Sequence, residues 1–344
     1  MQFIKSDINI NFVGAKTIAL IISIILVVIS IASLVIHKGP KYGVDFAGGS
    51  SIQIKFEDSV SIDSVKKGLA ELKLPKAAVQ QFGEKSDNEF QVRTNLSFMQ
   101  NADFTENLKD TLAAATGAAV IDVSLDMVGP QVSEDLRRKA LLAMFYALLF
   151  IAIYISGRFE LKWGMSILMA GSIGGGVYFI GQFIDAGIPV LILLALIGSL
   201  LFCWVFELKY AMGAIVALIH DVTITVGLFS ILNIEFTLPI IAALLTIIGY
   251  SLNDTIIVYD RIRENSKKYI KEPLAFIINK SINETLSRTI LTSLTTLVVV
   301  VTLFLKGGGV IHHFAFAMIT GILVGTYSSI FVASPILLAW QGKK

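Results

Sequence analysis

"GYSLNDTIIVYDRIREN", residues 249–265, continues an almost unbroken apolar run that begins at Leu238. At about 1.5 Å per residue, Asp254 stands roughly 24 Å along that run, inside the last third of a hydrocarbon core about 30 Å thick. A carboxylate at the centre of a spanning helix costs about 2.5–3.5 kcal/mol, and such residues usually face protein and mark an ion path. We therefore interpret Asp254, next to Asn253, as a proton-coupling position. The alternative is a helix-end charge that reaches water, for which the Asp side chain is short.

Apolar runs of this kind recur along the chain, which has 344 residues and is 55% hydrophobic. Soluble domains are about 45–50% apolar, and a helix needs about 20 apolar residues to cross a bilayer. The sequence therefore predicts an α-helical polytopic membrane protein. The eight predicted spans are residues 17–36, 140–156, 164–184, 188–206, 210–232, 238–259, 287–305 and 314–339. The first run is longer than a signal-peptide core of roughly 7–15 residues and has no small-residue cleavage site, so we interpret it as a retained helix.

Basic residues between the predicted spans fall on one side of the membrane. Arg158, Lys209, the basic segment 260–286 and the C-terminal lysines share that side, whereas the loops "DAGIP", "NIEFTLP" and "KGGGVIHH" lie on the other. Cytoplasmic loops hold the excess of Lys and Arg, so we expect both termini to be cytoplasmic. The basic segment is also expected to contact anionic lipid.

A polar stretch, residues 38–136, separates the first span from the transmembrane bundle of residues 137–344. Alternating apolar residues predict strands near 52–56, 77–83, 89–95 and 120–128, and helical spacing predicts helices near 62–72 and 103–116. Ser61 is the expected N-cap of the first of these helices. The strict alternation Ile121, Val123, Leu125, Met127 predicts one buried face for the last strand. The order β-α-β-β-α-β is that of a ferredoxin-like domain, which we expect on the extracytoplasmic side after residues 1–37.

A short repeat marks residues 160–206. Phe159-Glu160-Leu161-Lys162 recurs as Phe206-Glu207-Leu208-Lys209, and two apolar runs lie between the copies. We interpret this segment as an inserted helix pair with its turn at Asp185–Pro189; the alternative is coincidence between two loops of similar function.

Polar residues within neighbouring spans suggest partners for Asp254. Arg288 opens the span that follows, and consecutive antiparallel helices are usually neighbours, so the two side chains are expected to meet. Thr292, Thr295 and Thr296 continue one stripe from Arg288 and suit a chain of waters, although such threonines often bond only their own helix. Asp221, beside His220, lies near mid-membrane and is a second candidate for proton transfer, with no basic partner evident from the sequence.

Several classes of site are not expected. Cys203 is the single cysteine, which excludes an intrachain disulfide and a cysteine-based metal site. His312 and His313 lack further metal ligands nearby, and the glycines near 171–176 lie within a span, where they suit close helix packing better than a phosphate loop. Ala317, Gly321 and Gly325 predict the same close packing in the last span. We expect no cofactor, no metal and no nucleic-acid partner.

Five stretches carry a family resemblance: "YGVDFAGGSSIQIKF", "VGPQVSEDLRRKALLA", "GAIVALIHDV", "AALLTIIGYSLNDTIIVYDRIREN" and "ETLSRTILTS". They resemble SecF, the smaller membrane subunit of the SecDF protein-export complex, which is related to the RND transporters. The resemblance covers nearly the whole chain apart from residues near 160–206, where the family runs directly from one loop into the next helix. It implies six spans, so the helix pair is an addition here.

The resemblance also implies a function. It implies a bacterial inner-membrane protein that is not an enzyme, works with SecD and the SecYEG channel on translocating unfolded polypeptide, and uses the proton gradient to assist export. The family's intramembrane aspartate and arginine fall on Asp254 and Arg288, and we add Asp221, Asn253 and Thr292 as proton-coupling candidates. Two alternatives remain: an intramembrane aspartyl protease, for which the sequence lacks a Gly-x-Gly-Asp motif, and a stand-alone RND-type exporter.

Overall fold

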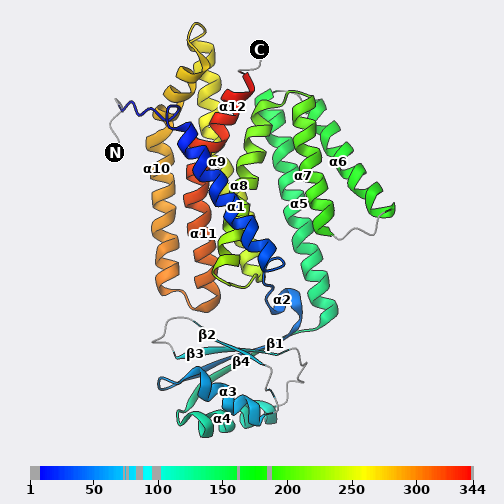
Figure 1. The fold of residues 1–344 in the computed structure, drawn as a ribbon, viewed down its shortest axis with the longest axis vertical. Helices are drawn as coiled ribbons and strands as arrows, with labels where there is room; N and C mark the ends of the chain where they lie inside the picture. The colour runs from blue at the N-terminus through cyan, green and yellow to red at the C-terminus, as the bar shows by residue number, and fades with distance from the viewer. Residues whose placement is uncertain are drawn as a thin grey trace.

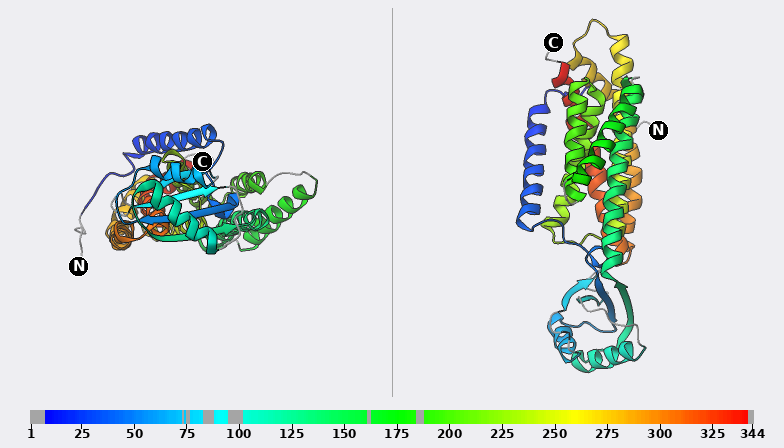
Figure 2. Two further views of the ribbon diagram at one scale, coloured as in Figure 1. Left: turned by 90° about the horizontal axis from the view of Figure 1, so that it is seen from below. Right: turned by 90° about the vertical axis from the view of Figure 1, so that its right-hand side faces the viewer.

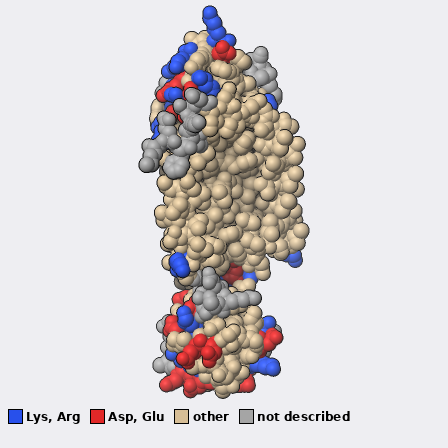
Figure 3. Space-filling view, turned by 90° about the vertical axis from the view of Figure 1, so that its left-hand side faces the viewer, with Lys and Arg blue, Asp and Glu red and all other residues tan. Residues whose placement is uncertain are grey.

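The computed structural model of the 344-residue chain describes residues 8–72, 74, 77–82, 88–94, 102–160, 163–183 and 188–341. It consists of a helical bundle with a small α/β domain at one end, and the first and last described segments lie near the opposite end (Figures 1 and 2). The face drawn in Figure 3 has no charged side chains across its middle, and charges gather at the two ends. This distribution matches a protein whose middle is surrounded by lipid.

Six helical segments within the described residues are long and apolar enough to cross a membrane. They are α1 (Lys16–Ile36), α5 (Pro130–Glu160), α8 (Lys209–Ile231), α9 (Leu238–Lys268), α10 (Leu274–Lys306) and the continuous run of α11 (Gly309–Ser328), the π-helix η2 (Ser329–Ala333) and α12 (Ser334–Gln341). The two other predicted spans form the helices α6 (Trp163–Phe183) and α7 (Ile188–Val205).

The helix pair α6 and α7 packs at the edge of the bundle. α6 contacts α5, and α7 contacts both α5 and α8. At the start of the pair, the Trp163 ring lies directly over Gly157, where a larger residue would collide with it. The pair therefore leaves the other helices of the bundle in mutual contact, as Figure 1 shows. The predicted turn at Asp185–Pro189 falls mostly outside the described residues.

Two helices begin much earlier than their apolar runs predict. α5 starts at Pro130 instead of residue 140, and α10 starts at Leu274 instead of residue 287. Hydropathy detects only the lipid-facing part of a helix, and the extra turns carry polar residues outside that part. α9 likewise continues to Lys268, so most of the basic segment 260–286 forms the ends of two helices. There Arg261 pairs with Glu264 and Glu284.

The α/β domain follows α1 through the short helix α2 (Val44–Ala47). Its elements are β1 (Gly49–Phe56), α3 (Ile62–Glu71), β2 (Ala78–Phe82), β3 (Glu89–Thr94), α4 (Ala102–Thr116) and β4 (Val120–Val128). The strands form one antiparallel sheet in the order β2-β3-β1-β4. The inward side chains of β1, Ile52, Ile54 and Phe56, pack with residues of α3 and α4 in one buried core. Ser61 caps α3 as predicted, because its hydroxyl accepts a hydrogen bond from the Ser64 N–H at 3.1 Å.

The strict alternation predicted for β4 is wrong at both ends. Val123 and Leu125 face the core, but Ile121 is exposed because the register slips between Lys55 and Phe56, so that Val120 pairs with Phe56. A β-bulge of this kind moves one residue out of the alternation. Met127 is exposed as well.

Candidate functional site

Asp254 lies inside the bundle where α9, α10 and α11 meet. Its side chain is buried, and the Ser293 hydroxyl of α10 lies 3.4 Å from Oδ2 as a hydrogen-bond donor. Ser293 is also 2.7 Å from the Thr326 hydroxyl of α11. Within the described part of the chain, the second carboxylate oxygen, Oδ1, and the nearby buried hydroxyl of Thr289 have no hydrogen-bond partner. Buried polar atoms are nearly always paired, so this carboxylate is held by fewer bonds than it can accept.

Arg288 does not pair with Asp254 in this structure. Both residues are described, no ion pair joins them, and the arginine side chain is exposed. The buried face of α10 includes Thr289 and Ser293, and Arg288 lies about 100° around the helix from Thr289 at 3.6 residues per turn. Arg288 therefore lies on the expected helix, on a face next to the one that contacts Asp254.

The threonine stripe after Arg288 also lies on that neighbouring face. Thr295 is exposed, Thr292 is half-buried, and all three predicted threonines donate to carbonyl oxygens of their own helix. Thr296 additionally accepts a hydrogen bond from Tyr250 at 3.4 Å. Asn253 is exposed too, on the side of α9 away from Asp254. The alternative interpretation of the threonines, bonds within one helix, therefore describes this structure.

Asp221 forms a second and more completely bonded centre on α8. The side chain is fully buried, and its Oδ2 accepts hydrogen bonds from Ser251 of α9 at 2.5 Å and from Ser328 of α11 at 2.8 Å. Its Oδ1 lies 2.9 Å from Nδ1 of His220. The sequence showed no basic partner for Asp221, and the structure supplies this neighbouring imidazole. Three helices thus converge on one carboxylate.

His220 extends this centre toward α1. Its ring stacks on Tyr327, whose hydroxyl donates to the Ala19 carbonyl oxygen at 2.6 Å and lies 3.0 Å from the Ser23 hydroxyl. The other ring nitrogen of His220, Nε2, is buried without a partner among the described residues. An imidazole with one bonded and one open nitrogen can exchange a proton at the open one.

α9 contributes to both carboxylate centres. It carries Asp254, and Ser251, one helical turn earlier, donates to Asp221. Gly321 and Gly325 let α11 come close: a Cβ on Gly325 would lie 2.8 Å from the Cβ of Ser251. This confirms the close packing predicted for the last span. Directly after Ser328 the helix continues as the π-helix η2. Such a local widening of a helix is frequent at functional sites.

Sequence reasoning missed the hydroxyl groups that position both carboxylates: Ser251, Ser293, Thr326 and Ser328. Of these four, only Ser251 lies within one helical turn of an aspartate along the sequence. The others come from α10 and α11, and their contacts depend on the rotation of those helices.

At the domain end, the loop between α8 and α9 attaches the bundle to the α/β domain. Glu235 in this loop forms ion pairs with Arg93 of β3 and with Lys41, the latter at 3.3 Å. Burial lowers the pKa of the Arg93 guanidinium to about 10, and burial with the nearby Arg93 charge lowers the pKa of the Lys41 ammonium. Asp45 of α2 accepts a hydrogen bond from the Leu238 N–H at 2.8 Å, at the start of α9. The helix that carries Asp254 is therefore bonded directly to the segment leading into the domain.

Replacing Glu235 with Gln is expected to loosen this attachment, because Arg93 and Lys41 lose the carboxylate between them. Hydrogen exchange of the backbone amides in residues 41–47 and 234–238 should become about tenfold faster or more, which corresponds to about 1.4 kcal/mol. Glu89→Gln is the matched control, because Glu89 pairs with Lys55 within the domain. Equal exchange in the two variants would show that Glu235 does not hold the domain.

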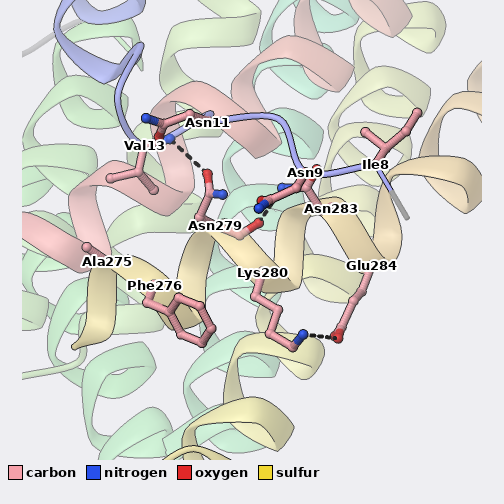
Figure 4. Close-up of a pocket in the computed structure, with 10 residues that line it drawn as sticks. All are labelled: Ile8, Asn9, Asn11, Val13, Ala275, Phe276, Asn279, Lys280, Asn283 and Glu284. Atoms are coloured by element: carbon pink, nitrogen blue, oxygen red, sulfur yellow. Dashed lines mark hydrogen bonds and ion pairs between the residues drawn. The ribbon is translucent and has the colours of Figure 1, made fainter. Parts of the chain in front are cut away.

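At the opposite end, two asparagines on α10 hold the N-terminal segment (Figure 4). Asn283 accepts from the Ile10 N–H at 2.9 Å and donates to the Ile10 carbonyl oxygen at 2.9 Å. Asn279 donates to the same oxygen at 3.0 Å and accepts from the Val13 N–H at 3.2 Å. A cavity of about 640 Å³ adjoins these contacts. We call Asn279 and Asn283 the asparagine clamp.

Comparison with known proteins places the chain in a family. The family described as "Protein export membrane protein SecD/SecF, C-terminal" matches residues 108–173 and 176–343, and the "SecD/SecF GG Motif" matches residues 33–60. A relative named "Protein translocase subunit SecF" from Desulfurispirillum indicum is 39% identical over 340 residues, covering 96% of this chain and 92% of the relative. One of the same name from Magnetococcus marinus is 40% identical over 342 residues, covering 98% and 94%.

Solved structures of SecDF also resemble this chain. SecDF from Thermus thermophilus, described as a translocon-associated membrane protein, superposes with a TM-score of 0.72 at 33% identity, covering 99% of this chain. SecDF in a super-membrane-facing form gives 0.58 at 31% identity, covering 98% of this chain. The chain spans 40% and 39% of the length of those two SecDF chains. The described part of the chain holds six helices long and apolar enough to cross a membrane. The chain is a multi-pass membrane protein that belongs to the SecF family of protein translocase subunits.

Proposed function

We propose that the protein is an accessory subunit of the Sec translocase that couples the proton motive force to protein export. The observation that carries this proposal is the incompletely bonded carboxylate of Asp254, buried among helices that cross the membrane. Intramembrane carboxylates that face a bundle interior mark proton paths. The names of the relatives, protein translocase subunits, support the export half of the proposal.

The mechanism we propose uses two arrangements of α10. In the arrangement described above, Ser293 bonds Asp254 and Arg288 faces outward. A rotation of α10 by about 100° brings Arg288 to the position of Thr289, where its charge stabilises the ionised carboxylate. Protonation of Asp254 removes that attraction and favours the serine-bonded arrangement. Asp221 with His220 is the second proton-binding centre of this proposal. The rotation carries Thr292 to the position of Ser293, beside the path, whereas Asn253, exposed on α9, is not moved by it.

Partners and topology follow from the family. We propose SecD as the direct partner, because this chain spans 40% of the SecDF chain that it resembles, which leaves the remainder for a second subunit. We further propose contacts with the SecYEG channel, with unfolded polypeptide in transit and with the lipid of the bacterial cytoplasmic membrane, and cytoplasmic positions for both termini. The antiparallel order β2-β3-β1-β4 and the β-α-β-β-α-β sequence of elements support a ferredoxin-like classification of the extracytoplasmic domain.

The proposal is tested by reconstitution. Vesicles containing the SecYEG channel, with or without this protein and SecD, are loaded with a preprotein arrested partway, and ATP is then removed. An imposed proton gradient should advance the preprotein only in vesicles that contain both subunits. Equal advance in both kinds of vesicle would contradict the proposal. Purification without a partner, together with proton-driven efflux of small molecules, would favour the stand-alone exporter instead.

We also propose eight spans in total, with α6 and α7 as a membrane hairpin. A cysteine at Gly187, in a variant in which the native Cys203 is replaced by Ala, should react with a membrane-impermeant maleimide added from the extracytoplasmic side. Labelling only after access from the cytoplasmic side would contradict the hairpin. A cysteine at Lys267, on the opposite side in this topology, is the control for sidedness.

A further inference from the structure

The cavity of about 640 Å³ beside the asparagine clamp lies between the N-terminal segment and the first turns of α10. We call it the clamp cavity. Its walls combine apolar side chains, among them Ile8, Val13 and Phe276, with two charged ones, Lys280 and Glu284. Figure 4 shows these two charged side chains one turn apart on α10 and joined to each other. Apolar walls with a few fixed polar groups are typical of a ligand-binding site.

The carboxylate of Glu284 is held in place from α9. Its Oε2 accepts hydrogen bonds from Nε of Arg261 at 2.6 Å and from the Asn265 amide at 2.7 Å. Asn265 is buried and also donates to the Ser281 hydroxyl of α10 at 3.0 Å. These bonds fix the orientation of the carboxylate, and its other oxygen, Oε1, is the one that lies near Lys280.

The ion pair between Lys280 and Glu284 is a loose one. Nζ and Oε1 are 3.6 Å apart, which is longer than a hydrogen bond, and neither side chain is buried. The ring of Tyr269, 5.3 Å from Nζ, adds a cation–π contact that orients the ammonium. An ammonium has three donors and a carboxylate oxygen two lone pairs, so both groups can still bond a ligand. The cavity therefore presents one positive and one negative group at a fixed spacing.

The clamp cavity lies at the height of the lipid headgroups. Glu284 and Lys280 stand roughly 6 and 12 Å along α10 before Arg288, which opens the predicted span, at about 1.5 Å per residue. The headgroup layer on each side of the hydrocarbon core is about 5–8 Å thick. Ile10 and Phe276, at the same end of the bundle, are large apolar side chains that are exposed. Contact with lipid removes such side chains from water, so the surroundings of the cavity favour a lipid as its ligand.

We propose that the clamp cavity binds the headgroup of a phospholipid that carries a primary ammonium beside its phosphate, as phosphatidylethanolamine does. The phosphate accepts hydrogen bonds from the Lys280 ammonium, and the ammonium of the lipid donates to Oε1 of Glu284, so two opposed ion pairs lie side by side. Phosphatidylglycerol has no cation for Glu284, and the quaternary ammonium of phosphatidylcholine has no N–H to donate. The bound lipid fills the space between the N-terminal segment and α10 and so reinforces the asparagine clamp.

The test measures lipid binding to the full-length protein by native mass spectrometry. The protein in mild detergent is titrated with phosphatidylethanolamine, phosphatidylcholine or phosphatidylglycerol, all with the same acyl chains. The first phosphatidylethanolamine should bind about tenfold or more tightly than the first phosphatidylcholine, because only the former donates to the carboxylate. Equal binding of these two lipids, or tighter binding of phosphatidylglycerol, would overturn the proposal. Soluble phosphoethanolamine at the same concentration should not displace the lipid; displacement would show that the ligand is a free phosphoamine and not a lipid.

Two variants localise the site, and each changes a different part of the lipid preference. Glu284→Gln should reduce the preference for phosphatidylethanolamine over phosphatidylcholine to within about twofold, because the ammonium of the lipid loses its ionic partner. Lys280→Gln should weaken both lipids equally, since both carry the phosphate. Glu264→Gln is the matched control, because Glu264 pairs with the same Arg261, at 2.8 Å, and is 67% exposed; its lipid preference should equal that of the unchanged protein. An unchanged preference in Glu284→Gln would overturn the proposal. If that variant does not fold, unchanged phosphatidylethanolamine binding by Lys280→Gln would do so.

Discussion

Asp254→Asn is expected to abolish proton-gradient-dependent export, while the protein stays folded and bound to its partner. Asparagine has nearly the same shape and can still accept a hydrogen bond from Ser293, but it cannot take up a proton. Export would be measured in the reconstituted vesicles described above, with and without an imposed gradient. Moving one charge through about 100 mV supplies roughly 2.3 kcal/mol, so each cycle biases a two-state equilibrium about fiftyfold. The loss of that bias should lower the export rate in the presence of a gradient to the export rate without one.

Asp260→Asn is the matched control for this experiment. Asp260 lies on the same helix, two turns nearer the end that carries both termini, and forms a half-exposed ion pair with Arg158 at 2.6 Å. Its replacement should leave gradient-dependent export within about twofold of the unchanged protein, because exposed pairs contribute only about 0–1 kcal/mol. Arg288→Ala should resemble Asp254→Asn, and Arg288→Lys should retain part of the activity. Normal gradient-dependent export by a well-expressed Asp254→Asn protein would rule out Asp254 as the proton carrier.

Asp221→Ala is expected to cause a large loss of stability. The change removes the shared acceptor of Ser251 and Ser328 and the partner of His220, and it leaves these buried polar groups unpaired. Removing one partner of a buried charged network costs about 3–5 kcal/mol. At about 2–4 °C per kcal/mol, the midpoint of thermal unfolding in detergent should fall by roughly 6 °C or more.

Asp221→Asn distinguishes the structural role of this centre from its role in proton transfer. The amide retains an acceptor and fills the same space, so its thermal midpoint should fall by less than half of the Ala value. Its gradient-dependent export should nevertheless be reduced, since an amide cannot exchange a proton with His220. Asp122→Ala, on the exposed surface of β4, is the control. A thermal midpoint for Asp221→Ala equal to that of this control would contradict the convergence of three helices on the carboxylate.

The burial of Asp254 was predictable from the sequence, and the faces of the other helices were not. A carboxylate within an apolar run is expected to face protein, and the Asp254 side chain is buried. Arg288 was expected on the same side of α10 as the aspartate, yet the side chains that face inward are Thr289 and Ser293. One residue around a helix is about 100°, and a mostly apolar span gives little contrast between its lipid-facing and protein-facing sides.

The α/β domain was more predictable, since its strands and helices carry a clear difference between buried and exposed faces. All four strands and both predicted helices are present near the expected residues. The exception is the bulge in β4, which depends on pairing with β1 and has no signature within residues 120–128.

The asparagine clamp has a consequence for biosynthesis. The contacts of Asn283 with Ile10 join positions 273 residues apart in sequence, so the first helix enters the lipid long before its anchor has been translated. Large apolar side chains cover most of the surface of α1, and the residues that it buries are small: Ala19, Ser23, Ser30 and Ser33. A helix with this surface is stable alone in lipid, since lipid tails are as apolar as the side chains of a neighbouring helix. α1 can therefore remain in the bilayer during synthesis and dock on α8 when that helix arrives. The asparagine clamp binds the N-terminal segment when α10 emerges, and the bond from Tyr327 of α11 to Ala19 forms after that.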